Sequence, residues 1–175
     1  MNVTCRNLNI SPHKLSKTLE TLFAVGLFTI FSGAVAWAAQ PLAPEVQSDV
    51  TVYKTVSCSC CGKWVDHLKR SGLNVDVIIV NETDAVRSRL GVPRELASCH
   101  TAVAGNYWVE GHVPADLVTR LLEEQPTDIK GISVPGMPLG SPGMESPRPV
   151  EYQVISVDDS GEMAVYARRM GRNAR

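Results

Sequence analysis

The sequence predicts an α/β fold built around one main domain. Segments rich in β-branched and aromatic residues alternate with segments of helical periodicity, and Gly, Pro and Asn mark the boundaries between them. A chain of 175 residues is long enough for one domain with its own core. The main domain is expected at residues 49–168, where these patterns occur.

The first predicted elements are a strand and a helix. Residues 49–56 (DVTVYKTV) are β-branched and aromatic with rough alternation, which is typical of a strand. Trp64, Val65 and Leu68 then follow helical spacing, and Gly72 is a plausible end of that helix. Trp64 is expected to anchor this helix in the core.

A second strand and helix follow, and then a hairpin. Residues 75–80 (VDVIIV) form a nearly continuous apolar run, which predicts a strand buried on both faces. A short helix is expected at 83–90, closed by residues 91–93 (GVP). Residues 100–113 predict two short strands joined by the turn pair at 105–106 (GN).

The last third predicts a helix, an irregular loop and a final β-hairpin. Residues 114–116 (PAD) open the helix, and residues 125–126 (QP) break it. The segment at 131–149 is so rich in Gly and Pro that no regular element is expected there. Strands are expected at 150–157 and 162–168. The complete order predicts a thioredoxin-like domain followed by a Pro/Gly/Met-rich loop and a hairpin.

The N-terminus predicts export. Lys14 and Lys17 precede an uncharged apolar run at 22–38, which ends in small residues of the kind that a signal peptidase reads. A retained anchor is the alternative, because the run approaches the ~20 residues that span a bilayer. We expect a signal peptide at 1–38, a linker at 39–48, the domain at 49–168, a basic tail at 169–175, and a periplasmic location.

The charge of the exported chain argues against nucleic acid as a partner. The whole chain has 17 basic and 18 acidic residues, and cleavage would remove three basic residues and one acidic residue, leaving a formal charge of −3. Nucleic-acid binding requires a concentrated basic surface. After signal cleavage we also expect no association with the membrane.

Four cysteines would remain after cleavage, and three of them are crowded together. Cys58, Cys60 and Cys61 lie where the first strand gives way to the first helix, and Cys99 lies far along the chain. In an exported protein an even number of cysteines usually indicates disulfides. Three clustered cysteines cannot all find separate distant partners when only Cys99 remains.

A redox function explains part of the cluster. Cys58 and Cys61 have Cys-x-x-Cys spacing at the expected start of a helix, where the helix dipole favours thiolate and suits thiol–disulfide exchange. Cys60 is then an unwelcome third thiol, because it offers competing disulfides beside the working pair.

A metal site explains more of it. Soft thiolate and thioether ligands favour Cu(I), and adjacent cysteines suit ions that share bridging thiolates better than one tetrahedral zinc. Met137 and Met144 lie in two Pro-Gly-Met units of the loop and could supply thioethers. Among the histidines, His67 is expected to be an ordinary hydrogen-bonded or surface residue, while His100 and His112 are open candidates.

Four motifs in one order resemble a known family. The segments CSCCGKWVDHL, SCHTAV, EGHVP and PGMPLGSPGME are similar to those of the exported bacterial family that includes the copper-resistance protein CopG, formerly catalogued as a domain of unknown function. The resemblance implies a periplasmic thioredoxin-like protein with a cysteine-bridged copper cluster. Carried over by position, it implies Cys58, Cys60, Cys61 and Cys99 as ligands; Ser59 stands where a glycine is expected.

Our hypothesis is therefore a copper-binding protein for copper resistance, with accompanying conversion of the copper redox state. It would hold more than one Cu(I) ion and exchange copper with periplasmic transfer proteins. Two alternatives stay open: a thiol–disulfide oxidoreductase that uses Cys58 and Cys61, and a structural exported domain with two disulfides. The expected metal ligands are Cys58, Cys60, Cys61, Cys99, Met137, Met144 and His112.

Overall fold

The computed structural model describes residues 48–172. The predicted signal peptide, almost all of the predicted linker and the last residues of the predicted tail lie outside the described residues. In chain order, the elements are β1 (Val50–Lys54), α1 (Ser59–Arg70), β2 (Val75–Ile79), α2 (Asp84–Leu90), the 3-10 turn η1 (Arg94–Leu96), β3 (Thr101–Ala104), β4 (Tyr107–Glu110), α3 (Ala115–Glu124), β5 (Gly131–Ser133), β6 (Glu151–Val157) and β7 (Met163–Met170).

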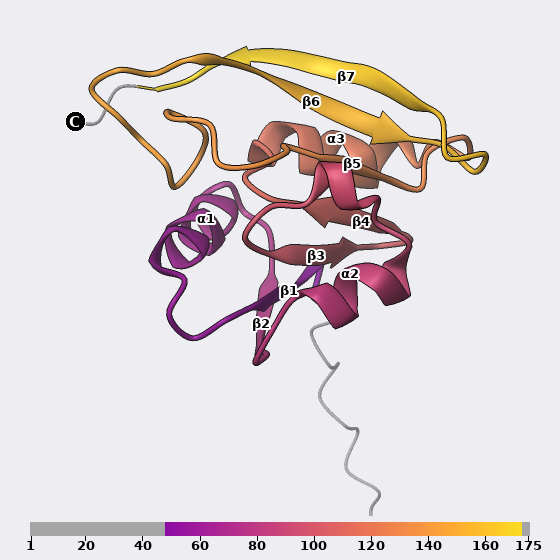
Figure 1. Ribbon diagram of the computed structural model, residues 1–175, viewed down its shortest axis with the longest axis horizontal. Coiled ribbons are helices and arrows are strands. Elements are labelled where there is room, and N and C mark those ends of the chain that lie inside the picture. Colours follow the sequence, from indigo (N-terminus) through magenta and orange to yellow (C-terminus); the bar gives the residue numbers. More distant parts are fainter. Residues whose placement is uncertain (1–47, 173–175) are drawn as a thin grey trace, which may run out of the picture. The chain divides into compact units, whose positions relative to one another are not determined.

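The seven strands form one mixed sheet in the order β2-β1-β3-β4-β5-β6-β7. The β1–β2 and β4–β5 pairs are parallel, and the other neighbours are antiparallel. The α/β class is thus confirmed. In Figure 1 the long β6–β7 hairpin crosses the top of the molecule, and the loop that precedes β6 descends toward α1.

Helices cover both faces of the sheet. The larger core is formed by α1, α3 and the sheet residues that face them, including Trp64, Leu68, Val118, Leu121, Val109 and Ile132. Trp108 is next to Val109 in β4, so it points to the opposite face. There it packs with Val92, Leu96 and Val157 in a smaller cluster beside α2 and η1.

Most predicted elements occur at their predicted places. The hairpin in 100–113 turns at Gly105, whose φ of 57° is a backbone conformation that glycine adopts without strain. The final pair of strands is antiparallel, and β7 runs to Met170, so it includes the first two residues of the predicted tail. Trp64 is fully buried, and its indole N–H donates to the carbonyl of Val113 at 2.7 Å.

Two predictions about the strands are wrong. The apolar run at 75–80 forms a strand, but β2 lies at the edge of the sheet: Val77 is 40% and Ile79 is 55% exposed, and only Val75 is buried. An apolar run cannot tell a central strand from an edge strand. The Gly/Pro-rich segment also contains a regular element, β5, which is three residues long and pairs with β4 and β6.

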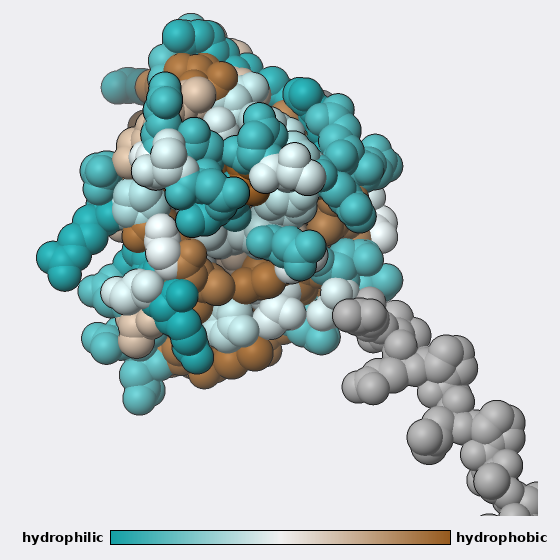
Figure 2. Space-filling model, turned by 90° about the vertical axis from the view of Figure 1, so that its right-hand side faces the viewer, coloured by the Kyte–Doolittle hydropathy of each residue, from teal (hydrophilic) through white to brown (hydrophobic). Residues whose placement is uncertain are grey.

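The surface seen in Figure 2 is mostly hydrophilic, with the larger apolar patches in its lower half and a smaller one at the top. Within residues 48–172, no helix combines the length and the apolar character that crossing a bilayer requires.

Candidate metal centre

The cysteine cluster is built on the first turn of α1. Cys58 is the N-cap residue of this helix, and its Sγ accepts a hydrogen bond from the backbone N–H of Cys61 at 3.3 Å. Cys58 and Cys61 form a disulfide, with their Cα atoms 5.4 Å apart. The predicted Cys-x-x-Cys pair therefore exists at the predicted strand-to-helix turn.

The other two cysteines are free thiols beside this pair. Cys60 Sγ lies 3.5 Å from Cys58 Sγ and 3.9 Å from Cys99 Sγ. Cys99 Sγ also lies 3.6 Å from Cys61 Sγ. Cys99 comes from the segment just before β3, so the fold joins residues 38 positions apart. All four sulfurs lie within 4.8 Å of one another.

Two histidines extend the cluster from Cys99. His112 Nε2 is 3.0 Å from Cys99 Sγ, and His100 Nδ1 is 3.4 Å from the same sulfur. Both histidines are fully buried, and their rings meet edge to face at a centroid distance of 5.0 Å. His100 also packs against Trp64, with centroids 4.4 Å apart. Cys99, His100 and His112 form a second group of donor atoms within 4.8 Å.

The tautomer of His112 follows from its partners. Its Nδ1 lies 2.8 Å from the carbonyl oxygen of Pro142, which can only accept a hydrogen bond. Nδ1 therefore carries the proton, and in the neutral ring Nε2 presents its lone pair toward Cys99. A ring oriented by a carbonyl in this way is typical of metal-binding histidines.

Burial keeps the histidines neutral. Burial lowers the pKa of His112, while the Pro142 carbonyl and the Glu145 charge oppose this shift. Burial, followed by the neighbouring His112, lowers the pKa of His100 to about 3. The Nε2 atom of His100 is buried without a hydrogen-bond partner. Two neutral imidazoles beside thiols form a donor set suited to a metal ion.

Cys99 is protonated in the metal-free protein. Burial, and next the proximity of Cys60, raise the pKa of the Cys99 thiol to about 12. Its S–H can then donate to His112 Nε2. A metal ion that binds Cys99 must displace this proton, so binding would release a proton and weaken at low pH.

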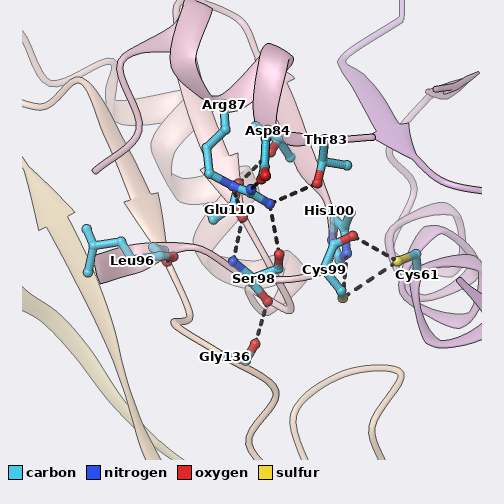
Figure 3. A network of polar contacts seen from close by, with 12 residues as sticks. Cys61, Thr83, Asp84, Arg87, Leu96, Ser98, Cys99, His100, Glu110 and Gly136 are labelled. Atoms are coloured by element: carbon cyan, nitrogen blue, oxygen red, sulfur yellow. Dashed lines mark hydrogen bonds and ion pairs between the residues drawn. The ribbon is translucent and has the colours of Figure 1, made fainter. Parts of the chain in front are cut away.

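A buried ionic network holds the segment that carries Cys99. Glu110 is fully buried, and its carboxylate accepts hydrogen bonds from Arg87 Nε at 3.0 Å, Ser98 N at 2.7 Å and Thr101 Oγ1 at 2.6 Å. Arg87 also donates to the Ser98 carbonyl at 2.8 Å and pairs with Asp84. Figure 3 shows this network around Ser98, with Cys99 and Cys61 beside it. Glu110 thereby fixes the backbone next to Cys99.

The loop between β5 and β6 closes over the start of α1. A Cβ atom on Gly143 would lie 2.8 Å from the Cys60 carbonyl oxygen and 2.9 Å from Trp64 N, so this loop touches the helix backbone. Met144 is half-buried, and its carbonyl accepts from Gly140 N at 2.7 Å. The side chain of Met137 is 55% exposed. Of the three predicted ligands outside the cysteines, His112 joins the cluster, while the thioether roles of Met137 and Met144 stay predictions.

His67 has the ordinary role that was expected of it. Its Nε2 accepts from the backbone N–H of Ala115 at 3.0 Å, at the first residue of α3. Burial, and then the charges of Arg172 and Arg70, lower its pKa. His67 connects α1 to α3.

The geometry of the donors fits a soft metal ion. Two sulfurs that bind one tetrahedral ion at ~2.3 Å lie ~3.8 Å apart. The three separations that involve a free cysteine, from 3.5 to 3.9 Å, lie close to this value, whereas Cys58 and Cys61 are bonded to each other and could act as two thiolate ligands only after reduction.

Sequence reasoning left two contributors unassigned. His100 was an open candidate. It lies two residues before Ala102 and four before Ala104, both of which face the core, so the alternation of a strand could have predicted that its ring is buried. The Arg87–Glu110 pair was not predicted, because nothing local joins residues of α2 and β4.

Comparison with known proteins agrees with these features. Residues 96–144 match the family described as "Protein of unknown function, DUF411". Two solved structures of the copper resistance protein CopG are similar, each 42% identical with a TM-score of 0.65: form 2 covers 69% of this chain and 96% of its own, and form 1 covers 70% and 97%. No curated protein matches the chain significantly. CopG is thus a relative of known structure, and the chain belongs to the DUF411 family, as its motifs predict.

Proposed function

We propose that the protein binds Cu(I) in a cysteine-bridged site with more than one ion and serves copper resistance in the periplasm. One observation carries the proposal: four cysteine sulfurs lie within 4.8 Å of one another, and one of them contacts two buried histidines. The similarity to CopG, which is a copper resistance protein, supports the choice of copper.

The donor types favour Cu(I) over harder ions. Thiolate sulfur and neutral imidazole are soft or borderline ligands, and the described cluster contains no carboxylate. Cys60 and Cys61 are adjacent, so one tetrahedral ion cannot easily use both. If thiolates bridge neighbouring ions, Cys60 and Cys61 can both serve as ligands, and for this reason we propose more than one ion.

Loading the full site requires the disulfide to open. Cys58 and Cys61 offer thiolates only after reduction, in which two thiols of a reductant become a disulfide and Cys58 and Cys61 become thiols. The protein would thus alternate between an oxidised form with two free thiols and a reduced form with four. This alternation supports a link between copper binding and redox chemistry.

We also propose a thioredoxin-like core and a periplasmic location. The parallel β1–β2 pair, the β3–β4 hairpin and α3 support a thioredoxin-like core. The predicted signal peptide supports a periplasmic location and exchange of copper with periplasmic transfer proteins.

The test is copper content after anaerobic reduction. We expect several copper ions per chain in the reduced protein, and fewer in the Cys60→Ser variant, because the bridging sulfur is lost. Ser57→Ala is a matched control on the exposed side of the same turn and should leave the copper content unchanged. A fully reduced protein that binds no copper would refute the proposal.

A thiol–disulfide oxidoreductase is the second candidate, and the Cys58–Cys61 disulfide favours it. Cys60→Ser separates the two functions: thiol–disulfide exchange by Cys58 and Cys61 would survive it, whereas a bridged copper site would not. A structural domain with two disulfides has less support, because Cys60 and Cys99 are both free among the described residues.

A further inference from the structure

Lys54 is a buried lysine directly before the cysteine turn. It ends β1, whose residues alternate so that Val50, Val52 and Lys54 face the core beneath α1. Lys54 is only 8% exposed. A lysine at such a position is unusual, because its ammonium group loses most of its hydration.

The ammonium group lies against the backbone that carries Cys58. Lys54 Nζ donates to the carbonyl oxygen of Thr55 at 2.9 Å, and the same oxygen accepts from the backbone N–H of Cys58 at 3.3 Å. One carbonyl thus connects the lysine to the N-cap of α1. The positive end of the helix dipole lies at the same place.

The strand register also places Lys54 at the end of the ladder from which His100 extends. In the antiparallel β1–β3 ladder Tyr53 lies opposite Thr101, and one further step in this register places Lys54 beside His100. Lys54 therefore adjoins the disulfide turn through the Thr55 carbonyl and leaves the β1–β3 ladder at the same end as His100.

No resident anion balances this charge. Among residues 48–172, no carboxylate pairs with Lys54, whereas the other buried cation, Arg87, is paired with both Glu110 and Asp84. An uncompensated buried charge is strongly destabilising, and the Thr55 carbonyl, a neutral group, is the acceptor that the Lys54 ammonium group has here, so the position suits a site where an anion can form. The residue that shares the Thr55 carbonyl with Lys54 is Cys58, which can become anionic once its disulfide is reduced.

We infer that Lys54 is the built-in countercharge of the cysteine cluster, stabilising its thiolates when they are reduced and when they hold Cu(I). Several thiolates around monovalent ions carry net negative charge, and a fixed ammonium group behind them offsets it without occupying a ligand position. Lys54 is a positioning and electrostatic residue, not a ligand. The copper half of this inference rests on the proposed function, whereas the thiolate half does not.

Two measurements test the inference on the same set of variants. The first is Cu(I) affinity of the reduced protein in competition with a chromophoric Cu(I) chelator. The second is the equilibrium of the metal-free protein with glutathione, in which two glutathione molecules reduce the Cys58–Cys61 disulfide to two thiols and form one glutathione disulfide. The variants are Lys54→Met, Lys54→Arg and the control Lys69→Met, which removes an exposed lysine from the last turn of α1.

We expect Lys54→Met to lower Cu(I) affinity about tenfold and to shift the glutathione equilibrium about tenfold toward the disulfide, because one nearby unit charge is lost. Lys54→Arg should restore both values to within about threefold, and Lys69→Met should change neither. In the oxidised, metal-free state Lys54→Met should be at least as resistant to urea as the parent protein, because an unpaired buried charge is gone.

Other outcomes overturn the inference. An unchanged glutathione equilibrium in folded Lys54→Met refutes the inference. A loss of urea resistance in Lys54→Met that Lys54→Arg does not restore also refutes it, because that loss indicates only a packing role for Lys54. If Lys54→Met does not fold, Lys54→Gln carries the same two measurements. If the parent protein binds no Cu(I), the proposed function fails, and the glutathione equilibrium still decides the role of Lys54.

Discussion

The Arg87–Glu110 pair predicts how strongly the metal centre depends on a contact outside it. Glu110→Ala leaves the Arg87 guanidinium buried and removes the acceptor of Ser98 N and Thr101 Oγ1. Breaking a buried ion pair from one side costs roughly 3 to 5 kcal/mol. Asp84 still pairs with Arg87, but it is 81% exposed, so it compensates weakly. We therefore expect the free energy of unfolding to fall by about 3 kcal/mol.

Urea unfolding of the oxidised, metal-free protein measures this change. Glu124→Ala is a matched control, because it breaks the Arg120–Glu124 pair, whose side chains are about half exposed, and should cost only ~0.5 kcal/mol. Since Ser98 precedes Cys99, Glu110→Ala should also lower the affinity of the reduced protein for Cu(I). A loss of stability below about 1 kcal/mol, equal to that of the control, would refute the reasoning.

Three further predictions concern the centre and its covering loop. The pKa of His100 is lower in the folded protein than in the unfolded chain, so the stability that depends on its neutral ring is fully present above pH 6.5 and is lost as the pH falls toward 3. By pH 5 this residue should have lowered the free energy of unfolding of the metal-free protein by ~2 kcal/mol, measured by urea unfolding. His100→Phe should remove this part of the loss of stability in acid. Gly143→Ala should destabilise the protein by at least ~1 kcal/mol more than Gly161→Ala in thermal unfolding. Both glycines have positive φ, but only Gly143 is crowded by α1. Equal losses of stability in the two variants would exclude an effect of the crowding. If Met144 supplies a thioether ligand, Met144→Leu should weaken Cu(I) binding more than Met137→Leu does, because Met137 is exposed. Competition with a Cu(I) chelator measures this difference. Equal effects of the two substitutions would argue against Met144 as a ligand.

Local patterns predicted the elements and the position of the cysteine turn well. Helical spacing of Trp64 and Leu68 and the stop at Gly72 locate α1, and the Gly105-Asn106 pair locates the β3–β4 hairpin. These signals depend on residues close in the chain. The burial of β2 was wrong because it depends on which strands become neighbours in the sheet, and that is decided by distant segments.

The same distinction applies to the metal centre. The crowding of Cys58, Cys60 and Cys61 is visible in the sequence, and the family resemblance implied a place for Cys99 beside them. The segment that carries Cys99 is held by Arg87 of α2 and Glu110 of β4, and this contact is visible only in the folded structure. Lys54 was detectable in principle, since the alternation of β1 points it inward with Val50 and Val52.

The hydrogen bond between His112 and Pro142 has a consequence for genetic studies of this protein. The acceptor is a main-chain oxygen, so every residue substituted at position 142 still supplies it. A scan of single amino-acid replacements would therefore register position 142 only through its effects on packing. Shortening the loop by one residue would move the oxygen itself, and deletions should reveal a control over the orientation of His112 that substitutions conceal.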